Sequence, residues 1–396
     1  MTNDDPQAAK PQPPVVIEDV FEGLRTDVEV EQDPQEGVTA EDHETDSTEF
    51  LESPQIRVIT SQFSLRNILD LIDEGSIELA PDFQRAYVWR PEQKSRLVES
   101  VLLQIPLPAF YFAENRDGGF KVVDGLQRLS TLHDFTRGGE DAFRLENMEY
   151  LTFGNGKKFA ELPPPWQRRM NNAQLTVYVI DPTTPPHAVY DIFLRINTGG
   201  TPLNAQEIRH SMSEPRSREI LKVMTRMPEF DEATGLAGHV RMNDREVVLR
   251  FAAFWLQGVD GYMNMPDMNR FLQVTTQILD DSESASDSRV DDLRVDFRRA
   301  MHNAKLVFGE HAFRKWPLGD ESRRPINRAL FETWSIALAR YTADDVTRRK
   351  NEIVRAARER MAFDLDYLDA ITSSTSDRRR VAYRFEKAAE DAAAGL

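Results

Sequence analysis

The spacing of apolar residues changes in character near residue 204. Before that point, short runs that alternate apolar and polar residues predict strands at residues 56–60, 77–79, 109–113, 120–123 and 174–180. Between them, apolar residues recur at helical spacing in residues 65–72, 91–105, 126–135 and 188–196. This mixture of strands and helices predicts an α+β domain over residues 55–203.

From residue 204 to the end, only helical spacing is present. Amphipathic helices are predicted at residues 204–212, 215–227, 243–257, 265–280, 289–308, 325–341, 343–361 and 377–393. No strand-like alternation separates them, and no internal repeat of fixed period is found. The sequence therefore predicts an all-α helical domain over residues 204–396.

The first 54 residues differ from both domains in charge. They hold sixteen acidic residues against Lys10 and Arg25, which accounts for −14 of the net charge of −17. Apolar residues are too sparse there to offset the entropy of ordering, so residues 1–54 are predicted to be a disordered, solvated acidic tail. The alternative is that the short apolar stretch at residues 15–21 docks as a peptide. The rest of the chain is nearly neutral, which excludes proteins that hold nucleic acid by an overall basic excess.

Composition excludes further classes of protein. The chain contains no cysteine, so disulfides, thiolate metal sites and cysteine nucleophiles are excluded. The absence of disulfides fits a reducing cytoplasm. No run of 18 apolar residues predicts a membrane span, and the N-terminus does not have the pattern of a secretory signal. We therefore expect a cytoplasmic protein with no membrane partner. The histidines show no metal-ligand spacing, and His133 is expected to be a packed or partly exposed helical residue rather than a general base.

The strongest chemical signal is a strand that runs directly into a helix at residues 122–129. Gly125 can adopt the positive φ or the close approach that such a corner needs. The first turn of the helix offers free N–H groups and a partial positive charge to an anion, and Gln127 and Arg128 lie in that turn. Asp124 beside them can hold a metal ion or orient the arginine. A plain strand-to-helix corner is the alternative, because Asp-Gly is also a common turn.

The second signal is a polar loop between two predicted helices, at residues 193–204. Its glycine pair, hydroxyls and amide can wrap phosphates or offer a ligand to hydrated Mg²⁺. It does not have the Gly-Lys-Ser/Thr of a Walker loop. Asn204 and Glu207 have the spacing of a capping box for the next helix. A structural helix–loop–helix corner is the alternative.

Two further segments give weaker signals. Residues 81–90 interleave aromatic residues with Arg85 and Arg90, which suits either base stacking or a packed core whose arginines reach water. Residues 378–380 together with Arg384 and Lys387 form a basic helix face. We expect that face to be solvated, with contact to nucleic acid as the alternative.

Taken together, three motifs in the same order resemble the N-terminal domain of GmrSD-type restriction proteins, a domain similar to the ParB/sulfiredoxin superfamily. The motifs are Pro-x-Phe-Gln-Arg-x-x-Val-Trp, Asp-Gly-x-Gln-Arg-Leu-x-Thr-Leu and Arg-Ile-Asn-Thr-Gly-Gly-Thr-Pro-Leu-Asn-x-Gln-Glu-Ile-Arg. The resemblance covers residues 55–215 firmly and the helical remainder loosely. It implies a compact ParB-like domain that binds a nucleoside triphosphate, in several members hydrolyses it, and acts in defence against foreign DNA.

The resemblance also implies roles for residues. Asp124, Gln127 and Arg128 match the family signature and are the expected catalytic residues. The expected nucleotide-binding residues are Gln84, Arg85, Gly125, Arg195, Asn197, Thr198, Gly199 and Gly200. Asp124 and Asn197 are the expected metal ligands, with Mg²⁺ bound together with ATP, GTP or CTP.

Two departures limit what the resemblance implies. Leu126 stands where many members have glutamine, so this position has no polar role here. The histidine–asparagine nuclease motif of many restriction relatives has no credible counterpart, so DNA cutting by this chain alone is not expected, and sulfiredoxin chemistry is excluded because it needs a cysteine.

We therefore expect a Mg²⁺-dependent nucleoside triphosphatase that acts as a sensor or regulatory subunit. It would be a homo-oligomer, with DNA and a separate nuclease or effector subunit as partners. The alternatives are a non-catalytic ParB-like adaptor for DNA or protein and, third, intrinsic metal-dependent nicking of DNA with Asp124 as a ligand.

Overall fold

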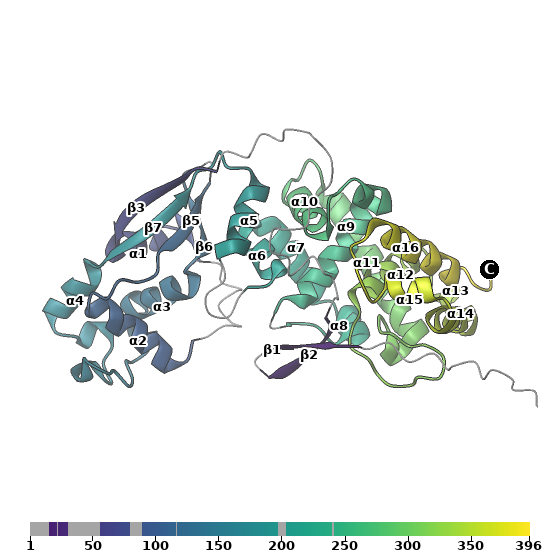
Figure 1. The fold of residues 1–396 in the computed structure, drawn as a ribbon, viewed down its shortest axis with the longest axis horizontal. Helices are drawn as coiled ribbons and strands as arrows, with labels where there is room; N and C mark the ends of the chain where they lie inside the picture. Colours follow the sequence, from purple (N-terminus) through teal and green to yellow (C-terminus); the bar gives the residue numbers. More distant parts are fainter. Residues whose placement is uncertain are drawn as a thin grey trace, which may run out of the picture. The chain divides into compact units, whose positions relative to one another are not determined.

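The computed structural model describes residues 16–21, 23–30, 56–79, 89–115, 117–196, 203–239 and 241–396. These residues belong to two compact units (Figure 1). The sheet unit comprises Thr48–Met212, and the helical unit combines Met1–Ser47 with Ser213–Leu396.

Five strands of the sheet unit form one mixed sheet in the order β3-β7-β5-β6-β4. The strands are β3 (Val58–Ser64), β4 (Ile77–Glu78), β5 (Phe110–Glu114), β6 (Phe120–Asp124) and β7 (Gln174–Ile180). Neighbours β3 and β7 are antiparallel, as are β5 and β6, whereas β5 runs parallel to β7 and β4 runs parallel to β6. The predicted α+β class is confirmed, and a mostly helical region follows the sheet in the chain.

Helices cover both faces of this sheet. One apolar cluster joins Phe112, Val122 and Val177 of the sheet to helices α1 (Leu65–Asp73), α2 (Pro91–Leu102), α3 (Leu126–Arg137) and α4 (Pro164–Asn171). A second cluster joins Val123 and Ile180 to α5 (Pro186–Ile196) and α6 (Ala205–Met212). Because α6 buries its apolar side in this second cluster, it belongs to the sheet unit and not to the helical domain that was predicted to begin at residue 204.

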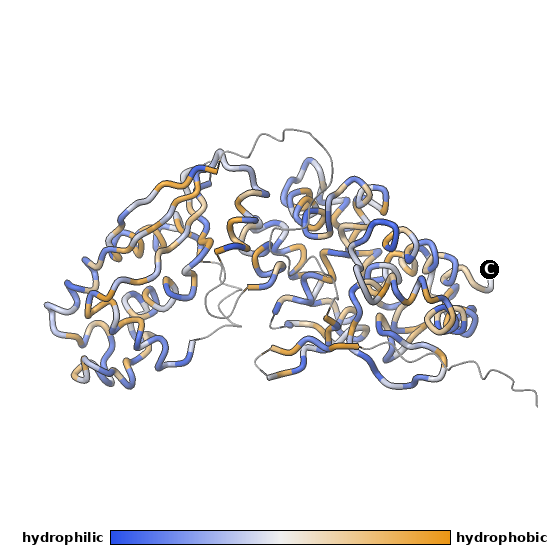
Figure 2. Tube along the Cα trace, viewed as in Figure 1, coloured by the Kyte–Doolittle hydropathy of each residue, from blue (hydrophilic) through white to orange (hydrophobic). Residues whose placement is uncertain are grey.

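The helical unit is built around one large apolar core. Its helices are α7 (Pro215–Thr225), α8 (Pro228–Thr234), α9 (Asn243–Met263), α10 (Met268–Asp280), α11 (Asp287–Phe308), α12 (Arg328–Leu338), α13 (Ala343–Arg348), α14 (Lys350–Phe363), α15 (Leu365–Ala370) and α16 (Arg378–Ala392). Figure 2 shows apolar and polar positions interspersed along them, as amphipathic helices require. The helix predicted at residues 343–361 is divided at Arg349, and the short helices α8 and α15 were not predicted. In the part of the chain that is described, no helix has the length and apolar character needed to cross a membrane.

The predicted basic face of the last helix is not a single surface. The Arg384 side chain is fully buried. It forms an ion pair with Glu332 and donates to the carbonyl oxygens of Ala370 and Thr375. Arg380 binds Asp369, and Lys387 binds Glu390. Only the tertiary structure places the carboxylate of Glu332 opposite Arg384, so neither a solvated face nor a nucleic-acid surface describes this residue.

The prediction of a wholly disordered tail over residues 1–54 is wrong for residues 18–21 and 24–29, which form two strands. Strands β1 (Glu18–Phe21) and β2 (Leu24–Glu29) form an antiparallel hairpin, in which residues 18–21 of the stretch considered as a docking peptide pair with β2. Val28 is fully buried in the core of the helical unit. The backbone of β2 also pairs with Ile326, whose N–H donates to Asp27 O at 2.8 Å.

Charges complete the attachment of this hairpin. Asp27 accepts two hydrogen bonds from the Arg314 guanidinium, at 2.9 and 2.7 Å, and two more from Arg323. Glu29 binds the buried Lys315 Nζ at 2.6 Å. Acidic residues that the sequence assigned to a solvated tail therefore neutralise cations that would otherwise be buried without a partner.

Replacement of Asp27 tests this attachment. Asp27→Asn keeps a side chain that tolerates the positive φ of this position but removes the charge that faces Arg314. We expect the free energy of unfolding to fall by about 1–3 kcal/mol, in the range of hydrogen bonds to charged groups, with faster hydrogen exchange at residues 18–29. The control is Arg25→Ala, an 83% exposed side chain whose loss should cost less than about 0.5 kcal/mol. Unchanged exchange in the Asp27 variant would contradict the attachment.

Candidate functional site

The candidate site begins where β6 meets α3. Phe112 pairs with Val122 and Tyr111 pairs with Asp124, so Val123 is an extra residue that forms a bulge in β6. Bulges bend a strand and change the direction of the side chains beside them. Asp124 thus ends the strand opposite Tyr111, immediately before the helix.

Gly125 connects the strand to the helix in a way that excludes other residue types. It lies in the left-handed region, with φ of +96°, and it is the N-cap of α3. A Cβ atom at this position would lie 2.3 Å from Phe110 Cδ1. Both the backbone conformation and the packing therefore require glycine, as the sequence suggested.

Arg128 fastens this corner to the start of β5. Its Nη2 donates to Asp124 Oδ2 at 2.6 Å and to the carbonyl oxygen of Ala109 at 3.3 Å, while Nη1 donates to the carbonyl oxygen of Pro108. The guanidinium carbon lies 4.4 Å from the centre of the Phe110 ring. Burial lowers the pKa of Arg128, and the Asp124 carboxylate offsets part of that shift. Arg128 is thus in the first place a positioning residue for Asp124.

The same corner leaves several polar groups available. In the part of the chain that is described, no hydrogen bond is made by Asp124 Oδ1, by the Gln127 amide, or by the backbone N–H groups of residues 126–128. The Asp124 side chain is 34% exposed. Free N–H donors and the positive end of the helix favour an anion here.

A row of side chains that sequence analysis did not identify leads away from this corner. Across the sheet, Asp124 pairs with Tyr111, Tyr111 with Tyr178, and Tyr178 with Thr60, so all four lie on one face. The two tyrosine rings are 4.9 Å apart, and neither hydroxyl bonds another described residue. Tyr178 lies two strand spacings from Asp124, or about 10 Å. The alternation in residues 174–180 could have assigned Tyr178 to the same face as other polar residues of its strand. It could not show which residues of neighbouring strands pair with Tyr178, because strand order is not visible in the sequence.

The second motif meets the same face of the sheet. Asn204 Oδ1 accepts from the Glu207 N–H at 2.8 Å, and Glu207 Oε2 accepts from the Asn204 N–H at 2.7 Å, so the predicted capping box is confirmed. Phe193 of α5 packs in the same cluster as Val123 of β6. Arg195 follows Phe193 near the end of α5 and is exposed.

Several expected site residues lie outside the described residues, so their roles stay predictions. In the first motif these are Gln84 and Arg85. In the second motif these are Asn197, Thr198, Gly199 and Gly200. Of the expected residues, the structure brings together Asp124, Gly125, Gln127 and Arg128.

Metal-binding capacity at the corner rests on a single carboxylate. Among the described residues, no group of three or more histidine, aspartate or glutamate side chains is arranged to hold a metal ion. Asp124 Oδ1 fits a Mg²⁺ ion that takes most of its ligands from phosphates and water, because such sites need only one or two carboxylates. His133 Nε2 lies 2.9 Å from Asp73 Oδ1 and links α3 to α1, and its side chain is partly exposed on the helix.

Comparison with known proteins gives one match that includes this corner. The family model described as "GmrSD restriction endonuclease, N-terminal domain" matches residues 65–213. The matched segment contains Asp124–Arg128 and the capped start of α6. No curated protein matches the chain.

Replacement of Gly125 tests the geometry of the corner. Gly125→Ala places a Cβ against Phe110 and strains φ, so we expect the sheet unit to lose about 3 kcal/mol or more of stability from strain and overpacking together. Gly118→Ala is the matched control, with φ of +85° but no atom within 4 Å of the added Cβ. It should cost only about 1–2 kcal/mol, for the backbone alone. Equal losses in denaturant unfolding would show that contact with Phe110 is unimportant.

Proposed function

Residues 65–213 belong to the GmrSD N-terminal domain family, and from this premise we propose that the sheet unit binds a nucleoside triphosphate at the β6–α3 corner and hydrolyses it. Membership of this family relates the protein to DNA-restriction systems. The nucleotide, its hydrolysis and a role as sensor or regulatory subunit are our proposal.

One observation carries the proposal. The corner is fastened by the hydrogen bonds of Arg128 and by close packing of Phe110 against Gly125, yet it leaves the first N–H groups of α3, the Gln127 amide and one oxygen of Asp124 without partners among the described residues. Phosphoryl transfer depends mainly on positioning and on electrostatic stabilisation, so a rigid set of free donors at a helix N-terminus suits it.

Each residue then has a distinct task. Gln127 orients the attacking water or the γ-phosphate. Arg128 holds Asp124 in place and adds positive charge beside the phosphates through Nε and the second Nη1 hydrogen, which bind no described residue. Mg²⁺ neutralises phosphate charge when bound, with Asp124 Oδ1 as the ligand from this corner and Asn197 as the second proposed ligand.

The tyrosine row suits the base of the nucleotide. Tyr178 and Tyr111 lie on the same face as Asp124, about 10 Å and 5 Å away by strand spacing. Aromatic rings stack on any nucleobase, because every base has a π face. We therefore propose that the base lies against Tyr178, which does not by itself select among ATP, GTP and CTP.

A non-catalytic adaptor is the second candidate, and the contacts of Arg128 favour it. Its three hydrogen bonds to Asp124, Pro108 and Ala109 are those of a structural residue, and such a corner could bind a nucleotide or another anion without turnover. The two candidates differ in phosphate release.

The triphosphatase proposal predicts turnover that depends on Gln127. Full-length protein with Mg²⁺ and ATP, GTP or CTP should release phosphate, and EDTA should abolish the release. Gln127→Ala should lower kcat by about 100-fold or more, as for loss of one positioned donor, with Tm unchanged. The control is Gln174→Ala, which removes an exposed amide whose one hydrogen bond within the described residues is to Asn172 O.

Three outcomes would contradict this assignment. Unchanged turnover in Gln127→Ala would remove the residue from the mechanism. Thermal stabilisation by nucleotide without phosphate release would favour the adaptor. Plasmid nicking that is lost in Asp124→Ala but kept in Arg128→Ala would favour metal-dependent nuclease chemistry.

Stacking on Tyr178 gives a separate prediction. Tyr178→Ala should raise the nucleotide Kd about 5- to 150-fold, equivalent to one lost stacking contact of about 1–3 kcal/mol, with kcat kept within about threefold. Tyr178→Phe should restore the affinity because it keeps the ring. Loss of affinity in the Phe variant would assign the effect to the hydroxyl and not to stacking.

A further inference from the structure

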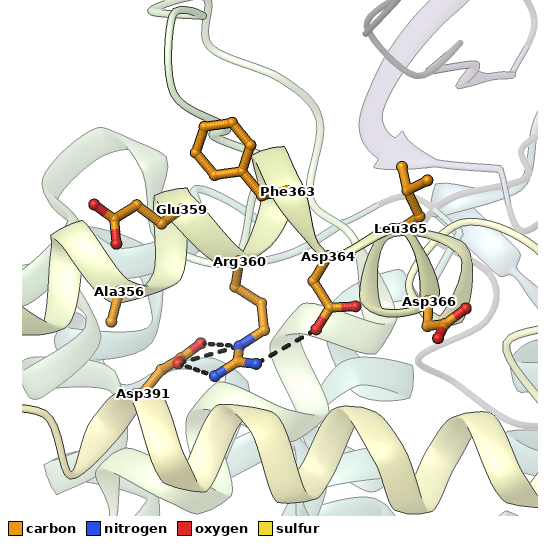
Figure 3. A pocket seen from close by; sticks show the side chains of 8 residues that line it. All are labelled: Ala356, Glu359, Arg360, Phe363, Asp364, Leu365, Asp366 and Asp391. Atoms are coloured by element: carbon orange, nitrogen blue, oxygen red, sulfur yellow. Dashed lines mark hydrogen bonds and ion pairs between the residues drawn. The ribbon is translucent and has the colours of Figure 1, made fainter.

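The helical unit carries a groove that the proposed function does not use. It has a volume of about 760 Å³ and lies between α14, α15 and the end of α16 (Figure 3). Phe363 and Leu365 line it, on either side of the junction between α14 and α15. Both side chains are unusually exposed for their type, at 72% and 70%. Large apolar side chains that lie close together at the surface are a feature on which a partner protein can dock.

The junction holds this pair outward. Asp364 is not helical, and its carboxylate caps α15 by accepting from the Tyr367 N–H at 2.9 Å. Met361 and Tyr367 on either side are buried in the core of the unit. Phe363 and Leu365 are therefore fixed by their buried neighbours and are not free to turn inward.

The charges of the groove are negative. Arg360 is the single cation among its lining residues, and three carboxylates bind it: its guanidinium donates to Asp391 at 2.7 and 3.0 Å, Glu390 at 3.1 Å and Asp364 at 3.4 Å. These carboxylates raise the pKa of Arg360. The bonds also fasten α14 to α16, so the groove is preformed.

Two carboxylates of the lining remain without a partner. Glu359 and Asp366 are exposed, and neither makes a hydrogen bond or ion pair with another described residue. Figure 3 shows them on the two sides of the groove, with Phe363 and Leu365 between them along the chain. The surface thus combines apolar anchors with uncompensated negative charge.

We propose that this groove is the docking site for a basic amphipathic helix of a partner protein. The apolar side of such a helix covers Phe363 and Leu365, and its lysines or arginines pair with Glu359 and Asp366. Nucleic acid and anionic membranes do not suit the surface, because their phosphates are repelled by the same carboxylates. The inference is independent of nucleotide binding in the sheet unit.

A synthetic helix serves as the probe in a binding experiment with the full-length protein. The probe is a labelled 18-residue peptide with leucines on one side and lysines on the other, measured by fluorescence anisotropy. We expect it to bind, with an affinity that falls as salt is raised. A scrambled peptide of the same composition should bind at least about tenfold more weakly, because apolar anchors must meet their contacts together. A peptide with glutamate in place of lysine should not bind.

Variants locate the binding. The double variant Phe363→Ser with Leu365→Ser should raise the Kd of the leucine- and lysine-containing peptide at least tenfold. Glu359→Lys with Asp366→Lys should raise it by a similar factor. The apolar control is Val295→Ser with Leu318→Ser, which are exposed outside the groove. The charge control is Glu283→Lys with Asp292→Lys, which are exposed acidic residues outside the groove. All four double variants should keep Tm, because only exposed side chains change, and hydrogen exchange of the unaltered protein should slow at residues 356–366 when the peptide is added.

Four results would overturn the proposal. Equal loss of binding in the control variants, or equal binding of the scrambled peptide, would reduce the effect to general attraction by an acidic protein. Self-association in sedimentation that the Phe363/Leu365 variant abolishes would make the occupant a second copy of this chain. Absence of protection at residues 356–366 would place the peptide elsewhere.

Discussion

The candidate site depends on the ion pair between Arg128 and Asp124. The arginine side chain is 13% exposed, so it needs an anion close by, and Asp124 supplies one at 2.6 Å. The same guanidinium binds two carbonyl oxygens at the start of β5 and stacks on Phe110. One side chain thus fixes the end of β6, the start of α3 and the entry to β5. Gly125 is required because Phe110 and Arg128 fill the space that a side chain would occupy.

In this arrangement, the residue that holds the corner in place differs from the residue that stays available to a ligand. In the sequence, Arg128 is the expected phosphate ligand, but most of its N–H groups donate to other residues of the protein. Gln127, one residue earlier, keeps its amide without a described partner. A nucleotide that binds at this corner therefore meets donors that are already in position, and little ordering accompanies the binding event. The bulge in β6 and the row of tyrosines extend the same surface along the sheet.

The helical unit is completed by residues from the start of the chain. Asp27 and Arg314 are 287 residues apart in sequence, and the whole sheet unit lies between them in the chain. Such a distant contact forms only after the intervening chain has been brought together, so the hairpin is expected to join the helical core late in folding. The unit also carries the acidic groove at α14–α16, whose charge is opposite in sign to that of the donors at the β6–α3 corner, the proposed nucleotide site of the sheet unit. The two surfaces consequently suit different partners, one a polyanion and the other a basic helix.

The sequence by itself determined what depends on neighbouring residues. Strand β7 agrees with the predicted residues 174–180, and the Asn204–Glu207 capping box forms as predicted, because both reflect backbone conformation and hydrogen bonds within a few residues. The strand–Gly–helix corner was also visible, since Asp124, Gly125, Gln127 and Arg128 are consecutive or nearly so.

Tertiary structure alone decided which groups have partners. The acidic charge of residues 18–29 predicts solvation, but Asp27 and Glu29 face the buried cations Arg314 and Lys315 from the far end of the chain. The sequence assigns Arg384 to a basic helix face, whereas in the structure it lies in the core and forms an ion pair with Glu332. Tyr111 and Tyr178 become neighbours only through strand order. The physical reason is common to all of these cases: the energy of a charge or a ring depends on what surrounds it, and distant segments of the chain provide those surroundings.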